Sequence, residues 1–454
     1  MNRLLFTVCL ALFSLSSFSQ QDSTIIRRIA NDVLRNSNAY SNLRVLTKTI
    51  GQRLSGSPQT YKAEEWGQKA LQAAGADRVY LQECKIPHWL RGGKDEAKLI
   101  VNNKETVLSV LALGNSIGTG PKGITAPAIL INNFDELEKR KNEIKGKIVF
   151  YNYGFNEEFI ETFRAYADAV RYRVDGPSRA AKYGAVATIV RSMTHSTDNY
   201  PHTGAMVYND SIRKIPAFAV GLWDADKLVT AIQQNKNVSV FVKTNAHALP
   251  DTVGYNVIGE LTGSEFPDQY ITVGGHLDSW DPAEGAHDDG TGCVHSIEVL
   301  RALKAIGYKP KHTIRIVLFS DEENKGGGSK AYSNEAKNKN EKHVFALESD
   351  AGGFTPRGFS INLPKDRLDK IRLWIPLLQP YGVYEFSAGS GGADVDPLNE
   401  KLGTPVGELI PDSQRYFDYH HSPNDVFENV NKRELELGAI NMAALIYLVD
   451  KYGL

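Results

Sequence analysis

The chain has 454 residues, and its 52 lysines and arginines nearly balance 53 aspartates and glutamates, giving a formal net charge of −1. A chain with this balance lacks the long-range positive field that would attract nucleic acid or an anionic membrane. Hydrophobic residues make up 42% and charged residues 23% of the sequence, which excludes a disordered chain and indicates a folded globular protein. The length predicts roughly two to four domains.

The first 20 residues have the pattern of a secretory signal peptide. Arg3 precedes an apolar stretch from Leu4 to Leu15, and a group of serines follows that stretch. The stretch is shorter than the roughly 18 apolar residues that a membrane anchor needs. We therefore expect a secreted or periplasmic protein with no membrane anchor.

Two cysteines, Cys84 and Cys293, follow this N-terminal segment. Two are too few for a disulfide framework, although an extracytoplasmic compartment would permit one. Cys293 lies on the apolar face of a predicted helix, and Cys84 lies in a predicted strand. Both are therefore predicted to be buried thiols.

Hydrophobic patterning divides the mature chain into a two-part main domain and an insert. The first part, 21–118, has a helical pattern over 21–49 and a second helix that begins at Pro58. From residue 119 the pattern changes to short strands around a helix, which predicts a smaller α/β domain inserted over 119–246. The strands of this insert are predicted at 128–131, 147–151 and 186–190.

The remaining segment, 247–454, completes the main domain and alternates strands with helices. Its strands are near-continuous apolar runs, as expected for strands that are buried on both faces. The predicted fold is therefore α/β, with a mostly parallel mixed sheet covered by helices. Strands are predicted at 270–273, 313–319 and 344–347, and a helix at 291–305.

Acidic and imidazole side chains follow directly after these strands. Because the carboxyl ends of parallel strands meet at one edge of a sheet, we expect these side chains to form one site there. A last group of such residues lies near the C-terminus. The candidates are His276, Asp278, Asp288, Asp289, Glu322, Glu323, Glu348, Asp350, His420, His421 and Asp425.

This mixture of imidazoles and carboxylates suits zinc, with cobalt or manganese as substitutes. No cysteine pair is available for a structural thiolate site, so the predicted metal is catalytic. A lone pair of glutamates is more often a solvated surface, but this many carboxylates in one crevice would repel each other unless cations neutralised them. Two metal ions fit the number of carboxylates.

The motifs, in this order, resemble those of the co-catalytic zinc aminopeptidase/carboxypeptidase family. They are His276-x-Asp278, Gly285-Ala-x-Asp288-Asp289-Gly-x-Gly292, Glu322-Glu323, Asp350 and His421-Ser-x-x-Asp425. One carboxypeptidase branch of the family also shares segments outside the site, and this likeness covers nearly the whole mature chain. The shared segments begin at Gly51, Ile86, Gly123, Phe134 and Pro201.

The resemblance implies two zinc ions that share one bridging carboxylate, Asp288. It also implies a cis peptide bond between Asp288 and Asp289. His420 is a rival of His421 as a ligand, but the family aligns the residue directly before serine or threonine. The implied ligands are His276, Asp288 and Asp350 for one ion, and Asp288, Glu323 and His421 for the other.

The resemblance assigns two further acids next to the metal ions. Glu322 would be the general base, because the attacking water needs an unligated carboxylate nearby to accept its proton. Asp278 would hold the ring of His276, because a ligating histidine usually gives its other N–H to a carboxylate.

The insert resembles a protease-associated domain, and we expect it to act as a lid or wall that selects substrates by shape. His202 is a candidate substrate contact from the insert. The loop with Gly391, Gly392 and Asp394 is a second candidate, although an ordinary glycine-rich turn explains this loop equally well.

The leading hypothesis is a di-zinc exopeptidase that hydrolyses short peptides, especially dipeptides with free termini, by means of a water between the two metals. A broad-specificity aminopeptidase is the alternative, because the same metal centre serves both activities. A more remote alternative is a receptor-like or scaffolding relative that has lost its metal, but such a protein should lack at least one ligand. A short peptide is the expected partner, and the oligomeric state stays open, with a homodimer as one option.

Overall fold

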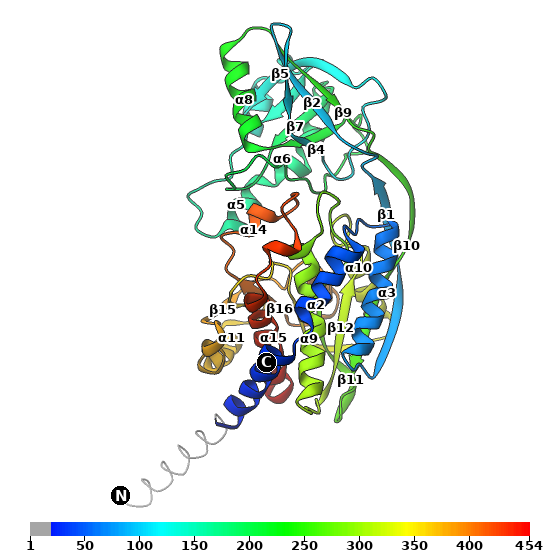
Figure 1. The fold of residues 1–454 in the computed structure, drawn as a ribbon, viewed down its shortest axis with the longest axis vertical. Coiled ribbons are helices and arrows are strands. Elements are labelled where there is room, and N and C mark those ends of the chain that lie inside the picture. Colours follow the sequence, from blue (N-terminus) through cyan, green and yellow to red (C-terminus); the bar gives the residue numbers. More distant parts are fainter. Residues whose placement is uncertain (1–19) are drawn as a thin grey trace, which may run out of the picture.

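The computed structural model describes residues 20–454, so the predicted signal peptide, apart from Gln20, lies outside the described residues. Two α/β bodies make up the described chain, and each is built on an eight-stranded sheet. In Figure 1 the insert lies above the main domain, and the long strands β1 and β10 run along one side of the main domain toward it. No helix within residues 20–454 has the length and apolarity needed to cross a bilayer.

The main sheet is mixed, with parallel strands at its centre. The four central strands, β12, β11, β13 and β16, are parallel to one another. The pairs β1–β10, β10–β12 and β14–β16 are antiparallel, and β15 is parallel to β14. The predicted α/β fold with a mostly parallel mixed sheet is confirmed. In sheet order the strands are β1 (Arg78–Leu90), β10 (His247–Leu261), β12 (His312–Phe319), β11 (Phe266–His276), β13 (Lys342–Glu348), β16 (Val406–Pro411), β14 (Pro356–Ile361) and β15 (Glu385–Ala388).

Helices cover both faces of this sheet because successive strand residues point to opposite sides. Ile316 of β12 packs in a cluster with the helix at 20–36, α3 (Pro58–Ala73), α9 (Thr291–Ala305) and α15 (Lys432–Tyr452). Its neighbour Val317 packs on the other face, against α10 (Gly327–Asn338) and α13 (Asp396–Leu402). The apolar runs of the sequence are therefore strands buried on both faces.

The N-terminal region, predicted to be helical over 21–49, is divided into shorter helices. Helix 20–36 ends before Ser37, and α2 (Ala39–Arg44) and the π-helical turn η1 (Val45–Ile50) follow. The side chain of Ser37 accepts the N–H of Ala39 at 3.0 Å, which satisfies a free donor at the start of the new helix. The predicted start of α3 at Pro58 is confirmed, and Ser57 caps it by accepting the N–H of Thr60.

The insert has its own sheet, which includes strands that precede residue 119. Strands β2, β3 and β4, before residue 119, pair with strands of the insert. The predicted start at 119 is therefore too late, and the insert begins at Glu96; its predicted end at 246 falls between β9 and β10. The sheet order is β3 (Lys104–Leu108), β2 (Glu96–Val101), β9 (Val238–Lys243), β5 (Ile124–Ile131), β6 (Ile148–Tyr151), β7 (Ala187–Arg191), β8 (Ala217–Val220) and β4 (Val110–Ala112).

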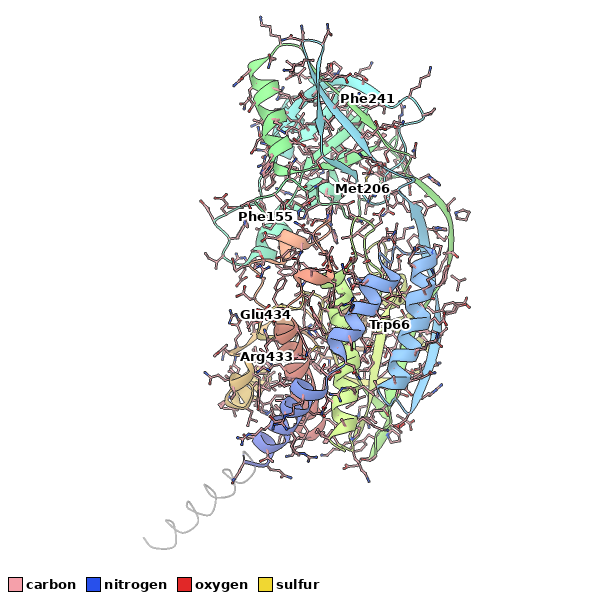
Figure 2. All side chains as sticks on the ribbon, in the orientation of Figure 1. Trp66, Phe155, Met206, Phe241, Arg433 and Glu434 are labelled. Carbon is pink, nitrogen blue, oxygen red and sulfur yellow. The ribbon has the colours of Figure 1, made fainter. Side chains whose placement is uncertain are left out.

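Aromatic side chains join the insert to the main domain. Helix α5 (Thr162–Ala169) of the insert packs on α14 (Tyr416–Tyr419), where the ring of Phe163 stacks on that of Tyr416 at 5.2 Å. Figure 2 shows Phe155 at the same junction, and its ring lies 5.4 Å from that of Phe417. The insert is therefore packed against the segment that leads to His421. The remaining helices of the insert are α4 (Phe134–Lys139), α6 (Arg171–Val174), α7 (Gly176–Lys182) and α8 (Leu222–Gln234).

Both cysteines are buried and free. Cys84 lies in β1 and Cys293 lies in α9, so the prediction of two buried thiols is confirmed.

Candidate metal centre

Neighbouring parallel strands bring most of the candidate side chains to one edge of the main sheet. His276 is the last residue of β11, Glu323 follows β12, and Asp350 follows β13. Asp288 lies in the turn η3 (Ala286–Gly290), directly before α9, and His421 follows α14. The residues that the sequence proposed as ligands therefore come from five separate segments.

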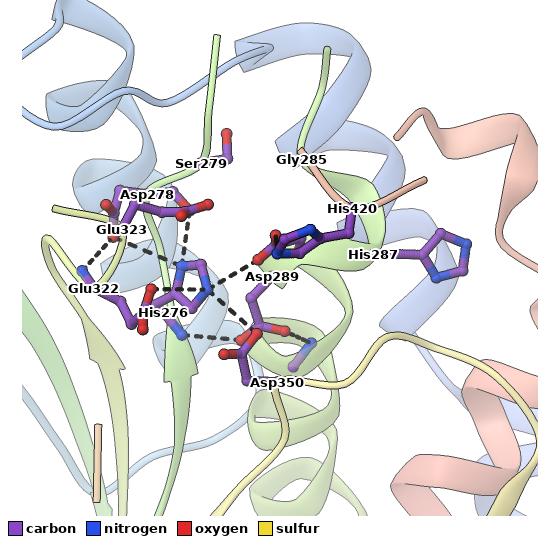
Figure 3. A network of polar contacts seen from close by, with 12 residues as sticks. His276, Asp278, Ser279, Gly285, His287, Asp289, Glu322, Glu323, Asp350 and His420 are labelled. Atoms are coloured by element: carbon purple, nitrogen blue, oxygen red, sulfur yellow. Dashed lines mark hydrogen bonds and ion pairs between the residues drawn. The ribbon is translucent and has the colours of Figure 1, made fainter. Parts of the chain in front are cut away.

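The five side chains form two groups that share Asp288. The Nε2 atom of His276 lies 3.2 Å from Oδ1 of Asp288 and 3.3 Å from Oδ1 of Asp350. The Nε2 atom of His421 lies 3.1 Å from Oδ2 of Asp288 and 3.0 Å from Oε2 of Glu323. Figure 3 shows the ring of His276 between Asp278 and Asp350.

The donor set fits metal ions. Two ligand atoms on a tetrahedral zinc ion, each about 2.0–2.1 Å from the metal, lie about 3.3 Å from each other, and the spacings of 3.0–3.3 Å match this value. Nε2 of His276, Oδ1 of Asp350 and Oε1 of Glu323 are buried and have no hydrogen-bond partner. Buried polar atoms are normally satisfied, so these atoms are available as ligands.

The electrostatic field of the site favours positive charge at both imidazoles. Burial alone would lower the pKa of His276, but the carboxylates of Asp350 and Asp288 raise it well above its ordinary value. Burial likewise opposes a charge on His421, whereas Glu323 and Asp288 raise its pKa well above the ordinary value. Cations at these two nitrogens would meet the same attraction.

His420 lies next to the centre but is farther from its carboxylates than His421. The two rings stack with centroids 3.5 Å apart, and Nε2 of His420 lies 3.9 Å from Oδ2 of Asp288. Burial, and then the charge of His421, lower the pKa of His420 well below its ordinary value. The geometry therefore favours His421 as the ligand.

Asp278 does not hold His276 in the expected way. Nδ1 of His276 donates to the backbone carbonyl of Asp278 at 3.0 Å, while the carboxylate of Asp278 lies 3.7 Å away. That carboxylate accepts the hydroxyl of Ser55 at 2.9 Å and the backbone N–H of Glu322 at 3.0 Å. The expected carboxylate contact is thus replaced by a main-chain contact, because the turn after β11 brings the carbonyl nearer to the ring.

Asp425 and Asp289 position the main chain of the site, a role that the sequence analysis did not assign to them. Asp425 accepts the N–H groups of His287 and Asp288 at 2.6 and 3.2 Å. Asp289 accepts the N–H of His276 at 3.0 Å and ties the end of β11 to the start of α9. The peptide bond between Asp288 and Asp289 is cis, as the resemblance implies. The shared motifs contained both acids, but motif spacing does not distinguish main-chain support from ligation.

His202 contacts the main chain near the site and does not line the open cavity. It is 2% exposed, and its Nδ1 lies 2.7 Å from the carbonyl oxygen of His420. The structure therefore gives His202 a supporting contact, and the substrate contact stays a prediction. Since its partner lies more than 200 residues away, the sequence could not indicate this role.

The glycine-rich loop after β15 also forms hydrogen bonds within the protein. Glu348 accepts the N–H of Asp394 at 2.9 Å, and Gly391 donates its N–H to Asp396 at 2.8 Å. A β-carbon at Gly392 would lie only 2.5 Å from the carboxyl carbon of Glu348. The loop is thus fastened to the end of β13 beside Asp350, and its three candidate residues do not line the cavity described next.

A cavity of about 220 Å³ lies over the metal centre. One wall consists of aromatic side chains from α5 and α14, so the insert forms part of the cavity. Arg173 is the one lining residue, among those that the structure describes, with a permanent positive charge. The cavity is lined by Phe163, Tyr166, Arg173, Ala205, Asp288, Glu322, Glu323, Asp350, Tyr416, Phe417, His420 and His421.

Histidine and carboxylate donors gathered at the carboxyl edge of an α/β sheet define a metal-dependent hydrolase. Residues 256–446 match the family model described as Peptidase family M28. Human carboxypeptidase Q is 35% identical over 411 residues, which cover 90% of this chain and 85% of that protein. The chain belongs to peptidase family M28, as its sequence motifs predicted.

Solved structures agree with this assignment. The crystal structure of a Peptidase M28 precursor from Shewanella amazonensis SB2B has a TM-score of 0.90 and 31% identity, covering 95% of this chain and 97% of that one. A zinc aminopeptidase from Bacillus subtilis has a TM-score of 0.64 at 21% identity, covering 91% of this chain and 95% of that one. The second structure shares the fold.

Proposed function

We propose that the protein is a zinc-dependent exopeptidase that hydrolyses short peptides, in particular dipeptides with free termini. Two zinc ions would be held, one by His276, Asp288 and Asp350 and the other by Asp288, Glu323 and His421. The observation that carries this proposal is the pair of donor groups joined by Asp288, with donor spacings of 3.0–3.3 Å. The presence of all five ligand residues in one cluster argues against a metal-free receptor-like relative.

The zinc ions, when bound, polarise the peptide carbonyl and lower the pKa of the attacking water. Glu322 is the general base in this proposal, because it lines the cavity and its Oε2 lies 4.0 Å from Nε2 of His276, outside both donor groups. Burial, with the neighbouring charge of Asp350, raises the pKa of Glu322 well above its ordinary value. Two bound cations would oppose this rise and favour the ionised carboxylate that a general base needs. The proton then passes from Glu322 to the leaving amine.

The size and charge of the cavity support a small zwitterionic substrate. Its volume of about 220 Å³ is below the roughly 300–1,000 Å³ typical of drug-sized ligands. Carboxylates surround the metal centre, and Arg173, whose Nη1 lies 3.5 Å from Nδ1 of His421, adds one positive charge to the lining. A dipeptide with a free ammonium and a free carboxylate matches this distribution, and the human relative is named a carboxypeptidase.

The insert would act as a wall that selects substrates, because Phe163 and Tyr166 of its helix α5 line the cavity.

We also propose that residues 1–20 act as a signal peptide, so the reaction takes place outside the cytoplasm.

A substrate comparison tests the proposal. Leucine-containing dipeptides are compared with leucine chromogenic amides, which lack a free C-terminal carboxylate, with and without a chelator. We expect cleavage of the dipeptides, little or no cleavage of the amides, and loss of activity with the chelator that zinc restores. Efficient cleavage of the amides would favour a broad-specificity aminopeptidase instead, and chelator-resistant cleavage would exclude the metal mechanism.

A further inference from the structure

We propose that the insert positions His421 for metal binding through the segment His202–Gly204, which makes the insert a structural part of the metal centre. This inference rests on the proposed function, since it assumes that His421 binds zinc. It differs from the expectation that the insert acts only as a lid or wall. The argument depends on contacts between this segment and the two histidines that follow α14.

The segment holds both the main chain and the ring of His421. Thr203 donates its N–H to the carbonyl oxygen of His421 at 2.9 Å. The carbonyl oxygen of Thr203 lies 3.3 Å from Nδ1 of His421. His202 adds a third contact, because its Nδ1 lies 2.7 Å from the carbonyl oxygen of His420.

These contacts fix which ring nitrogens carry hydrogen. A carbonyl oxygen can only accept, so Nδ1 of His202 donates to His420 and Nδ1 of His421 donates to Thr203. Nη1 of Arg173 also lies 3.5 Å from Nδ1 of His421, but the carbonyl oxygen is nearer at 3.3 Å, and Arg173 donates to that same carbonyl. Burial lowers the pKa of His202 to about 4, so this ring is neutral and protonated at Nδ1. In neutral His421 the same hydrogen at Nδ1 leaves the lone pair on Nε2, the atom that faces Asp288 and Glu323. The partner of the other ring nitrogen normally sets the orientation of a metal-binding histidine in this way.

His421 depends on such support because its backbone is in an unfavourable conformation. Its φ angle is +59°, in the left-handed region that residues with side chains rarely adopt. A conformation of this kind is strained and persists only where surrounding contacts impose it. The segment 202–204 of the insert supplies contacts on both sides of this residue.

Glycine is required at position 204 for the close approach. A β-carbon there would lie 2.6 Å from Nδ1 of His421 and 2.4 Å from Nη1 of Arg173, and the φ angle of Gly204 is +127°. Arg173 itself donates to the carbonyl oxygen of Thr203 at 3.3 Å. The glycine therefore lets the main chain of the insert lie directly against the ring.

The segment is itself held firmly within the insert. Thr203 is fully buried and donates its hydroxyl to the carbonyl oxygen of Ala112 at 2.8 Å. The N–H of His202 is donated to the hydroxyl of Ser192 at 2.9 Å. Because Ala112 lies in β4 and the buried Ser192 directly follows β7, a shift of the insert would move the contacts to His421 with it.

The test uses His202→Leu, which removes the hydrogen bond to His420, and His202→Asn, whose amide N–H can take the place of Nδ1. Gly204→Ala tests the close approach, and Gly154→Ala is its matched control, because a β-carbon at Gly154 meets no atom within 4 Å. Zinc per chain and the affinity of each zinc ion are measured by competition with a chelator. Circular dichroism of the zinc-free proteins reports their folding.

We expect His202→Leu and Gly204→Ala to lower the affinity for one of the two zinc ions by about 10–100-fold. The affinity for the other ion and the circular dichroism should be unchanged. His202→Asn should restore much of the lost affinity, and Gly154→Ala should bind zinc like the wild type. Unchanged affinity in His202→Leu, or equal weakening of both ions, would overturn the inference. A wild-type protein that binds no zinc at His421 would overturn the proposed function as well, which distinguishes the two failures.

Discussion

The carboxylate of Asp278 accepts the backbone N–H of Glu322 at 3.0 Å, while its backbone carbonyl accepts the ring N–H of His276 at 3.0 Å. One residue thus positions a proposed metal ligand with its main chain and the proposed general base with its side chain. The hydroxyl of Ser55 fixes the other carboxylate oxygen at 2.9 Å. Because the two roles use different atoms, substitution of the side chain can separate them.

Replacement of Asp278 by alanine should reduce kcat and leave both zinc ions bound. The carbonyl that holds His276 stays in place, whereas Glu322 loses the acceptor for its N–H. A displacement of a catalytic group by about 1 Å can cost about 100-fold in rate, so we expect kcat to fall by about 10–100-fold with little change in KM. Asp278→Asn, which keeps an acceptor oxygen, serves as the control, and its kcat should fall less. Loss of zinc from Asp278→Ala would show that the carboxylate supports the ligand after all.

Replacement of Glu322 by glutamine should abolish most turnover while both zinc ions are retained. Glutamine cannot accept the proton of the attacking water, and general-base catalysis contributes about 10²–10⁴-fold. Steady-state kinetics on a dipeptide and zinc analysis of the same preparation check both parts. A variant that had lost a zinc ion would indicate that the roles of Glu322 and Glu323 are reversed.

Replacement of Asp288 by alanine should weaken the binding of both zinc ions together. Its two carboxylate oxygens lie 3.2 Å from Nε2 of His276 and 3.1 Å from Nε2 of His421. Asp350→Ala is the comparison, since it removes a ligand from the His276 group alone. Metal analysis after dialysis should give less zinc per chain for Asp288→Ala than for Asp350→Ala. Two tightly bound zinc ions in Asp288→Ala would contradict a bridging role.

The strand ends were the part of the site that the sequence could predict. A strand buried on both faces must be apolar throughout, so the polar residues at its end stand out, as His276 does after β11 and Asp350 does after β13. Helix α9 was predicted with the bounds it has, Thr291–Ala305. Motif order then identified the family without any knowledge of the fold.

Contacts between distant segments could not be predicted in this way. The alternation of apolar and polar residues in β2 is the same whether the strand joins the main sheet or the insert. Its pairing with β9 could therefore not be predicted from the sequence. The contact between His202 and His420 spans 218 residues. A histidine and a main-chain carbonyl leave no pattern in the sequence that would identify them as partners.

Outside the site, the pH dependence of stability should change when Glu64 is replaced by glutamine. Glu64 is 4% exposed in α3 and accepts the N–H of Tyr255 at 2.8 Å, and burial raises its pKa from 4.5 to about 7. Between these two pH values the folded chain holds a proton that the unfolded chain has released, so this residue destabilises the fold increasingly as the pH rises toward 7.

Glutamine stays neutral and keeps an oxygen for Tyr255. Urea unfolding should therefore show Glu64→Gln to be more stable than the wild type by about 1–3 kcal/mol at pH 8, and equally stable near pH 4.5. The exposed neighbour Glu65, changed to glutamine, should show no gain at pH 8; an equal gain there, or none in Glu64→Gln, would contradict the raised pKa.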